Sequence, residues 1–409
     1  MVDFTVPEEI ALTIDGLRAF IAREVVPLEE AHRDLLENPH TAYGPDGRLV
    51  PQIQELRRQV RTAAAQAGYY NLFTPADLGG AGQGPLALFL VWEALYHHAG
   101  PGRLLPYEAV AHWVTGAGPI LRGLTAVARA EVLPGLLSGE KTSCFALSEP
   151  DAGSDVWAMK TRAVRDGDAW LLTGTKQWIS YSPYAAHAVV FAVTDPERLA
   201  RREGGISCFL VDTDWPGFSL DSVIRLFGHA GGNEAVLSFQ ELRVPAHRLI
   251  GAEGEGFRLA LAGVNTGRLY NCARAVGLGR WALERATAYA KQRVAFGHPI
   301  AEYQGVQWLL AESAMELYAA RMMGLNCAWR LEQGEPAIKE TAMIKAFATE
   351  AGFRTLDRCM QVFGGLGLTN ELKLFDGWHQ LRIVRIADGS AEIMRRTIAQ
   401  RLLKGDLDF

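Results

Sequence analysis

The stretch GFRLALAGVNTGRLYNCARAVGLGRWALERATAYAKQR, residues 256–293, decides the fold of the C-terminal part of the chain. Its apolar residues recur at the i, i+3, i+4 spacing of a helix, so it predicts one helix of about 35 residues and roughly 50 Å. Three further long helical patterns follow, and the last is AEIMRRTIAQRLLK, residues 391–404. Four long helices predict a four-helix bundle.

The chain before this stretch shows two other residue patterns. Residues 7–141 carry helical periodicity broken at Pro and Gly, whereas residues 142–254 carry short β-branched and aromatic runs such as TRAVRDGDAWLLTG, which predicts two strands around a DG turn. No helix of crossover length separates these runs, which favours an antiparallel barrel or sandwich. We therefore expect an α+β chain with an N-terminal α-helical domain (1–141), a middle antiparallel β-barrel or sandwich domain (142–254) and a C-terminal four-helix bundle (255–409).

Composition excludes several classes of protein. The chain has 409 residues, is 49% hydrophobic and carries a net charge of -5 without a basic stripe, so nucleic acid is not an expected partner. Its five cysteines show no disulfide or metal-binding spacing, and we expect no metal. The N-terminus does not resemble a signal peptide, and no apolar run approaches the roughly 20 residues of a membrane span. We expect a soluble cytoplasmic protein.

Two motifs in the β region are candidates for ligand binding. CFALSEPDAGSD, residues 144–155, offers a hydroxyl and backbone N–H groups at a turn that could read the edge of a flat polar ring. In KQWISYS, residues 176–182, Trp178 could lie against a planar cofactor while Ser180 on the same face donates a hydrogen bond. Judged locally, the first is as compatible with a plain strand and turn, and the second is more typical of a core tryptophan.

The third motif is IADGSAEIMRR, residues 386–396. Its local pattern favours a helix start, with Ser390 as the cap and Asp388 as an acid near the positive helix end. The glycine-rich segments 79–84 and 363–367 lack the strand-before, helix-after setting of a dinucleotide fingerprint. No P-loop or GxSxG elbow is present either, so phosphoryl transfer and α/β-hydrolase chemistry are not supported.

Taken in order, the motifs resemble the acyl-CoA dehydrogenase family over nearly the whole chain. The segments that carry the resemblance are FALSEPDAGSD, KQWIS, LRVPAHRLIGAEGEGF, TGRLYNCARAVGLG, RVAFGHPIAEYQGVQWLLAE, QVFGGLGLTNE and RIADGSAEI. Each segment is weakly specific alone, whereas seven in register are highly specific.

The resemblance implies the same three domains, a homodimer or homotetramer, and FAD as cofactor. It also implies a role in fatty acid or acyl-CoA catabolism, namely α,β-dehydrogenation of an acyl-CoA thioester. A carboxylate takes the α-proton while the β-hydrogen leaves as hydride to flavin N5, and the electrons pass to an electron-transferring flavoprotein. Such a base needs a dry pocket that raises its pKa.

By resemblance, the cofactor-binding residues form two sets. The set at the flavin and its phosphates comprises Phe145, Leu147, Ser148, Ser154, Trp178, Ser180, Ser390 and Glu392. The set that reaches the adenine half of an FAD held mainly by a neighbouring subunit comprises Arg293, Phe296, Gln304, Gln361 and Gly365. The implied substrate-binding residues are Ser154, Asn265, Arg268 and Ala387.

The base differs from the family's usual residue. Most members carry Glu-Gly-Thr where this chain has Asp388-Gly389-Ser390, and other branches place a glutamate on the first bundle helix, where this chain has Gly267. Asp388 is thus the motif-matched catalytic base, with a side chain about 1.5 Å shorter. Ala387 also replaces a bulky aromatic residue, and together these changes indicate a branched, cyclic or substituted acyl group.

Three functions stay open at this point. The leading hypothesis is an FAD-dependent acyl-CoA dehydrogenase. A flavin oxidase or monooxygenase on the same fold is the enzymatic alternative, and a non-catalytic flavin-binding homologue is the alternative of another class.

Overall fold

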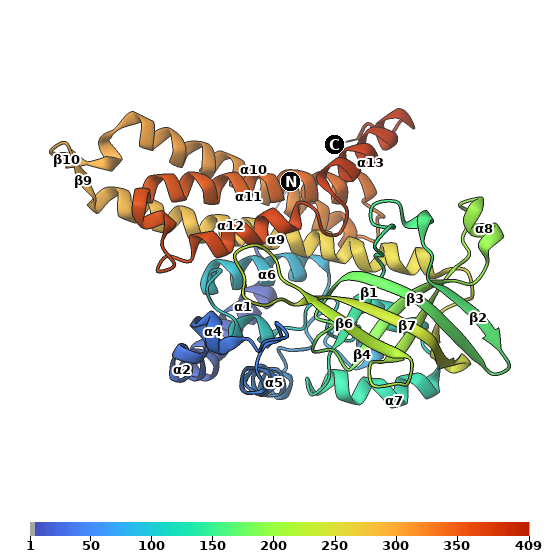
Figure 1. Cartoon of the computed structure of the whole chain (residues 1–409). Helices are drawn as coiled ribbons and strands as arrows, with labels where there is room; N and C mark the ends of the chain where they lie inside the picture. Colours follow the sequence, from blue (N-terminus) through green and yellow to red (C-terminus); the bar gives the residue numbers. More distant parts are fainter. Residues whose placement is uncertain (1–4, 409) are drawn as a thin grey trace. The chain divides into compact units, whose positions relative to one another are not determined.

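The computed structural model describes residues 5–408, and its elements follow the expected order of helices, strands and helices (Figure 1). The helical start contains α1 (Glu8–Phe20), a π-helical turn (Ile21–Val25), α2 (Val26–Ala31), α3 (Arg33–Glu37), α4 (Pro39–Ala42), α5 (Pro51–Gln66), α6 (Pro85–Ala99) and α7 (Ala126–Leu137). The predicted α+β fold class is confirmed. Within residues 5–408, no helix has the length and apolar character that a membrane span requires.

The middle of the chain forms an 8-stranded sheet. Its members are β1 (Ser143–Ala146), β2 (Arg162–Asp166), β3 (Ala169–Ser180), β4 (His187–Val193), β5 (Ile206–Asp212), β6 (Phe218–Ile224), β7 (Glu234–Pro245) and β8 (Leu249–Ile250), with the short helix α8 (Pro196–Ala200) between β4 and β5. The strand order is β6-β7-β3-β2-β4-β5-β8, and β1 pairs with β4. Most pairings are antiparallel, and β1 and β2 each meet β4 in parallel.

The C-terminal elements are α9 (Gly256–Gln292), β9 (Val294–Ala295), β10 (His298–Pro299), α10 (Gln304–Glu332), α11 (Ile338–Phe363), α12 (Leu374–Val384) and α13 (Ala391–Leu403). The prediction of one helix of about 35 residues is confirmed, since α9 has 37. The expected domain limits fall in the loops before β1 and before α9, and they stay predictions.

Two compact units are built from segments that are discontinuous in sequence. The bundle unit comprises residues up to 19, residues 84–103 and the chain from 264 onward, and the sheet unit comprises residues 20–83 and 104–263. Each is described by itself below.

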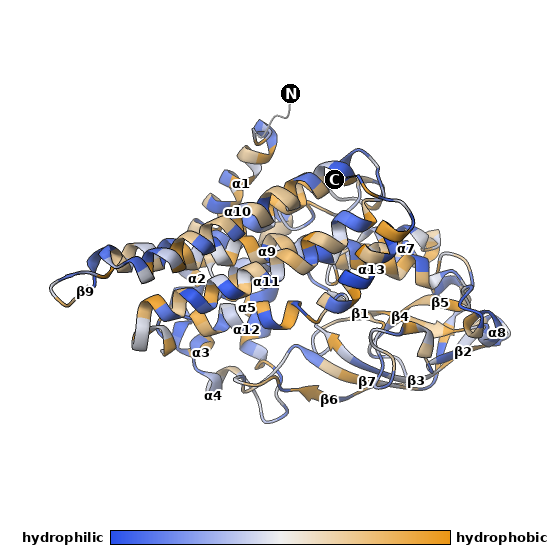
Figure 2. Cartoon of the chain, turned by 90° about the horizontal axis from the view of Figure 1, so that it is seen from above, coloured by the Kyte–Doolittle hydropathy of each residue, from blue (hydrophilic) through white to orange (hydrophobic). Residues whose placement is uncertain are grey.

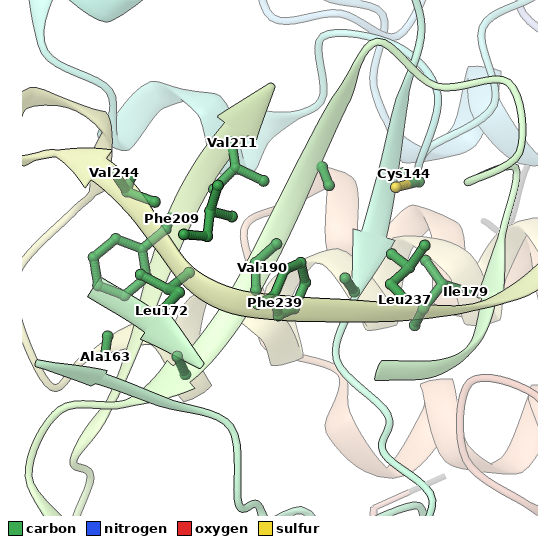
Figure 3. Close-up of a cluster of buried hydrophobic side chains, with 14 of the residues drawn as sticks. Cys144, Ala163, Leu172, Ile179, Val190, Phe209, Val211, Leu237, Phe239 and Val244 are labelled. Carbon is green, nitrogen blue, oxygen red and sulfur yellow. The ribbon is translucent and has the colours of Figure 1, made fainter. Parts of the chain in front are cut away.

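The core of the sheet unit follows from the two-residue period of its strands. In β4, Ala188, Val190 and Ala192 pack into one cluster with apolar residues of β3, β5 and β7 (Figure 3). The alternate residues Val189 and Phe191 pack into a second cluster that includes residues of α7. Because β4 is buried on both faces, it reads as a continuous apolar run rather than an alternating one.

The hairpin expected around the DG turn is confirmed. Strands β2 and β3 pair antiparallel from Asp166 and Ala169 outward. Gly167 between them has φ +59°, the left-handed conformation that such a turn requires.

In the bundle unit, α11 packs against α10, α12 and α13, and α10 packs against α6. These helices carry mixed hydrophilic and hydrophobic residues along their lengths (Figure 2). The buried carboxylate of Glu93 on α6 joins the helices, because it accepts hydrogen bonds from Arg280 of α9 at 2.7 Å and Arg321 of α10 at 2.8 Å. Charge-assisted bonds of this kind tie three helices to one buried anion.

Glycines permit the close approach of α6 and α9. A Cβ at Gly277 of α9 would lie 2.5 Å from the carbonyl oxygen of Glu93 and 2.7 Å from the Cβ of Tyr96. We expect Gly277→Ala to lower the stability of the protein by about 1–3 kcal/mol through overpacking, although alanine is the better helix former.

The matched control is Gly305→Ala near the start of α10, where an added Cβ meets no atom within 4 Å. It should leave stability unchanged or raise it by up to about 1 kcal/mol. Chemical denaturation of the two variants and the wild type measures both effects. Equal stability of the two variants would contradict the close packing of α6 on α9.

Candidate active site

Asp388 lies in a tight turn between α12 and α13 of the bundle unit. Asp388 has φ +57° and Gly389 has φ +94°, so two consecutive residues adopt the left-handed conformation. Aspartate tolerates this region better than most residues, and glycine enters it without a steric penalty. The pair Asp-Gly is therefore suited to the turn that presents the carboxylate.

Long cationic side chains hold this turn through its backbone. Arg268 of α9 donates from Nε to the carbonyl oxygen of Asp388 at 2.9 Å. Lys345 of α11 donates from Nζ to the carbonyl oxygens of Gly389 and, at 3.3 Å, of Arg385. The Arg268 guanidinium is in turn held by Asn265, whose Oδ1 accepts from its Nη1 at 2.9 Å.

The Asp388 carboxylate points to α9 rather than to the start of α13. Asn271, buried on α9, donates from Nδ2 to Oδ2 of Asp388 at 2.7 Å. The cap of α13 is Ser390, whose Oγ accepts from the backbone N–H of Ile393 at 3.4 Å. The predicted cap is thus confirmed, and the Asp388 side chain bonds to α9 instead of capping α13.

The electrostatics of the carboxyl group are mixed. Burial raises the pKa of Asp388 above its usual range. The charge of Lys345 and the hydrogen bond from Asn271 oppose this rise, and the charges of Arg268 and Arg274 act in the same opposing direction. Burial also lowers the pKa of the Lys345 ammonium to about 8.

Two predicted site residues near Asp388 in the sequence are more exposed than Asp388. Ala387 and Glu392 are exposed, and Glu392 lies in the first turn of α13. Its own backbone N–H and the Ser390 hydroxyl hold the pKa of Glu392 below its usual range. These residues therefore lie beside Asp388 in sequence but in a wetter environment.

In the sheet unit, the two β motifs are brought side by side. The backbone N–H of Gln177 donates to the carbonyl oxygen of Ser148 at 2.9 Å, which joins the segment 145–148 to the segment 176–180. Phe145, Leu147, Ser148 and Ser180 are partly buried, and Ser154 is exposed. The structure thus assembles most of the predicted flavin set from the sheet unit at one place.

Trp178 is not a core residue. Its side chain is 53% exposed, and its backbone has φ +65° at an irregularity in the pairing of β3 with β7. A non-glycine residue held in the left-handed region is strained, and such strain clusters at functional sites. Ser180 donates from Oγ to Oε1 of Glu234 at 3.3 Å, and burial raises the pKa of that carboxyl.

A buried ion pair supports these segments. Lys176 and Glu149 are almost completely buried, and Nζ of Lys176 lies 2.8 Å from Oε1 of Glu149. The same ammonium donates to the carbonyl oxygen of Leu147 at 3.0 Å. Burial lowers the pKa of Lys176 to about 8, while the neighbouring ammonium holds the pKa of Glu149 below its usual range against its own desolvation.

The predicted adenine set lies at another part of the bundle unit. Arg293 follows α9 directly, Phe296 is 96% exposed with φ +51°, and Gln304 begins α10. Gln361 and Gly365 lie near the end of α11, where Phe363 contacts Tyr289 of α9 with ring centroids 4.7 Å apart. Along α9, position 293 is about 37 Å from Arg268, so this set and Asp388 are well separated within the unit.

Several residues at these places were missed by sequence reasoning. Asn271 follows Arg268 at the i+3 spacing that places both on neighbouring positions of one helix face. Glu149 and Lys176 are ionisable residues inside the two quoted β motifs. No sequence pattern around Lys345 indicates its contact with the Asp388 turn, because that contact depends on how the turn after α12 packs against α11.

Comparison with known proteins agrees with this arrangement. Three family models match the chain: the acyl-CoA dehydrogenase N-terminal domain over residues 7–140, the middle domain over 144–242 and the C-terminal domain over 254–403. The mitochondrial short-chain specific acyl-CoA dehydrogenase of Homo sapiens is 35% identical over 387 residues, covering 93% of this chain and 92% of that protein.

Solved structures match over similar lengths. Butyryl-CoA dehydrogenase from Megasphaera elsdenii has a TM-score of 0.83 at 25% identity, and a structure described as the electron transferring flavoprotein of Acidaminococcus fermentans has 0.84 at 27%. Each match covers 98% of this chain and 100% of the other. The chain therefore belongs to the acyl-CoA dehydrogenase family, whose members use FAD to dehydrogenate acyl-CoA thioesters.

Proposed function

We propose that Asp388 removes the α-proton of the acyl-CoA substrate while the β-hydrogen leaves as hydride. The observation that carries this proposal is the carboxylate itself, which is partly buried, directed away from the helix it precedes and bonded to Asn271. FAD, when bound, supplies the hydride acceptor at flavin N5. The steps below concern what the chain's own residues do.

The protonation chemistry suits a base. Burial raises the pKa of Asp388, which strengthens it as a proton acceptor near neutral pH. Asn271 engages Oδ2, so we assign Oδ1 as the oxygen that receives the proton. Lys345 and Arg268 keep the backbone of the turn in place whichever protonation state the carboxyl has, because both donate to backbone carbonyl oxygens.

The residues of the sheet unit fit a flavin. An exposed indole held in a strained backbone conformation offers a flat apolar surface for a planar ring. Beside it, the hydroxyl groups of Ser148 and Ser180 are polar groups of the kind that orient such a ring. We assign Phe145, Leu147, Trp178 and these two serines to the flavin, with Ser154 at a phosphate or the CoA arm.

The remaining assignments follow the family. We assign Asn265, Arg268 and Ala387 to the substrate, and Ser390 and Glu392 to the flavin. We assign Arg293, Phe296, Gln304, Gln361 and Gly365 to the adenine half of an FAD held mainly by a second subunit, because about 37 Å of helix separates them from Asp388.

Large exposed apolar residues on α10 agree with a homo-oligomer: Trp308, Met315, Tyr318 and Trp329.

The electron acceptor follows from the same family. We propose that an electron-transferring flavoprotein receives the electrons, since one matching structure is described under that name. This makes a dehydrogenase, rather than an oxidase, the function that we expect.

Replacing the base tests the proposal most directly. The Asp388→Asn holoenzyme should retain its yellow FAD but lose anaerobic bleaching by acyl-CoA by at least about 10³-fold, because the amide cannot accept the proton. Stopped-flow absorbance of the flavin measures this loss. Asp357→Asn, which makes the same change at an exposed aspartate of α11 outside the predicted site, is the matched control and should still bleach.

The three outcomes against the proposal are distinct. Full bleaching by Asp388→Asn would refute the choice of base, and a colourless wild-type protein would refute the use of FAD. Rapid peroxide formation when the reduced wild-type enzyme meets air would favour an oxidase over a dehydrogenase.

The pH dependence of kcat/KM tests the environment of the base. Asp388 must be ionised to accept a proton, so activity should rise with pH through a pKa that lies above the usual aspartate range. Asn271→Leu removes a hydrogen bond that favours the ionised form, so the acidic limb should move to higher pH. Asn265→Leu is the control, because Asn265 bonds to Arg268 rather than to the carboxylate. An acidic limb that Asn271→Leu leaves in place would contradict the assignment.

The buried pair behind the flavin segment gives a stability prediction. Lys176→Met leaves the carboxylate of Glu149 buried without its cation, which should cost about 3–5 kcal/mol of folding free energy and weaken FAD retention. The double variant Lys176→Met/Glu149→Gln should recover much of the stability. Thermal denaturation and FAD content complete this cycle, and additive losses would contradict a direct pair.

A further inference from the structure

Ser180 and Glu234 lie opposite each other on neighbouring strands of the sheet unit. In the antiparallel pairing of β3 with β7, Ser180 is the partner of Glu234, and the adjacent pair is Ile179 with Ala235. Ile179 and Ala235 belong to the core cluster of the sheet. Because successive side chains of a strand point to opposite faces, the Ser180 hydroxyl and the Glu234 carboxyl share the face that lies away from this core.

The contact between these two side chains is a long hydrogen bond. Oγ of Ser180 donates to Oε1 of Glu234 at 3.3 Å, whereas such bonds between oxygen atoms usually measure about 2.7–2.8 Å. A serine hydroxyl carries one proton and two lone pairs, and it rotates to suit its partners. A bond of this length therefore allows the hydroxyl to exchange Glu234 for another acceptor.

Glu234 differs from Glu149, the other carboxyl group beside the predicted flavin segments. Against its desolvation, the Lys176 ammonium at 2.8 Å holds the pKa of Glu149 below its usual range. Burial instead raises the pKa of Glu234, and the hydrogen bonds from Ser180 and from the backbone N–H groups of residues 233 and 234 oppose this rise, as does the charge of His229. Of the two carboxyl groups, Glu234 thus takes up a proton more readily.

The protonation state of Glu234 decides what Ser180 can offer to a ligand. An ionised carboxylate only accepts hydrogen bonds, so it takes the Ser180 proton and leaves the lone pairs of Oγ to the ligand. A neutral carboxyl can donate its own proton to Oγ, which frees the Ser180 proton for an acceptor on the ligand. The edge of an oxidised flavin ring offers several acceptor atoms, so it is better matched while Glu234 is neutral.

We propose that Glu234 is a positioning residue that directs the Ser180 hydroxyl, so that Ser180 donates to the oxidised flavin only while Glu234 is neutral. This inference rests on the proposed assignment of Ser180 to the flavin. Glu234 acts through Ser180 and does not itself have to touch the cofactor. The affinity for oxidised FAD therefore falls as the pH rises through the pKa of Glu234, because the hydroxyl turns to the carboxylate.

The decisive measurement is the dissociation constant of oxidised FAD at a series of pH values. Dilution of the holoenzyme, followed by the fluorescence of released flavin, gives this constant. A range of about pH 5 to about pH 7.5 stays below the pKa of about 8 of Lys176. Over this range the constant should rise roughly 3- to 10-fold more in the wild type than in Ser180→Ala, the size of one hydrogen bond. Asp388 is unchanged in every variant, so its own titration is a constant background.

Three variants separate an action through Ser180 from a merely structural role. Glu234→Gln cannot ionise and should lose the pH dependence. Ser180→Thr keeps a hydroxyl and should keep the pH dependence that Ser180→Ala loses. The matched control is Glu197→Gln, which removes the charge of a carboxylate of α8 that is 87% exposed and should behave like the wild type.

His229→Gln identifies the titrating group. It removes a charge that favours the ionised form of Glu234, so the pH dependence should persist and its midpoint should move to higher pH. Loss of the pH dependence in this variant would overturn the inference, because the histidine would then be the group that titrates.

The failures of the two proposals are distinguishable. A pH dependence that is equal in the wild type and in Ser180→Ala overturns the role of Glu234 and leaves FAD binding standing. A wild-type protein that holds no FAD at any pH overturns the proposed function as well. If Glu234→Gln does not fold, the comparison of the wild type with Ser180→Ala and Ser180→Thr still decides the inference.

Discussion

The left-handed turn at Asp388 and Gly389 is the constraint on which the candidate active site depends. A carboxylate that is to be partly buried must be presented by a backbone that cannot relax toward solvent. Arg268 and Lys345 provide this constraint because they reach the turn from two different helices and donate to its carbonyl oxygens. Burying these cations is costly, and hydrogen bonds to backbone carbonyls offset part of the cost.

A buried lysine also holds the backbone of a predicted site segment in the sheet unit. Lys176 is buried, has its pKa lowered to about 8 and donates to the carbonyl oxygen of Leu147, as Lys345 does to that of Gly389. In each case a lysine donates to a backbone carbonyl oxygen of the segment that carries the predicted site residues.

The sequence allowed the fold class and the motifs to be predicted, but not the side-chain contacts that hold the Asp388 turn. The 37 residues of α9 and the hairpin at Gly167 could be read from local periodicity and turn chemistry, which act over a few residues. The cap at Ser390 was equally local. Trp178 could not be read in this way, because an exposed tryptophan and a core tryptophan have the same β propensity. Lys345 and Asn271 lay outside prediction because they meet Asp388 only after helices distant in sequence pack together.

The balance of charge around Asp388 bears on the role of proton acceptor that we propose for it. Desolvation alone would push the carboxyl toward its protonated form, in which it could not accept a proton. The charges of Lys345, Arg268 and Arg274 oppose that tendency because they favour the ionised carboxylate. In the proposed mechanism, the carboxyl loses its negative charge when it takes the α-proton while the cations remain, so the site would favour returning that proton. These cations therefore suit a carboxylate that has to be ionised before each turnover and that is neutral only between taking up the proton and releasing it.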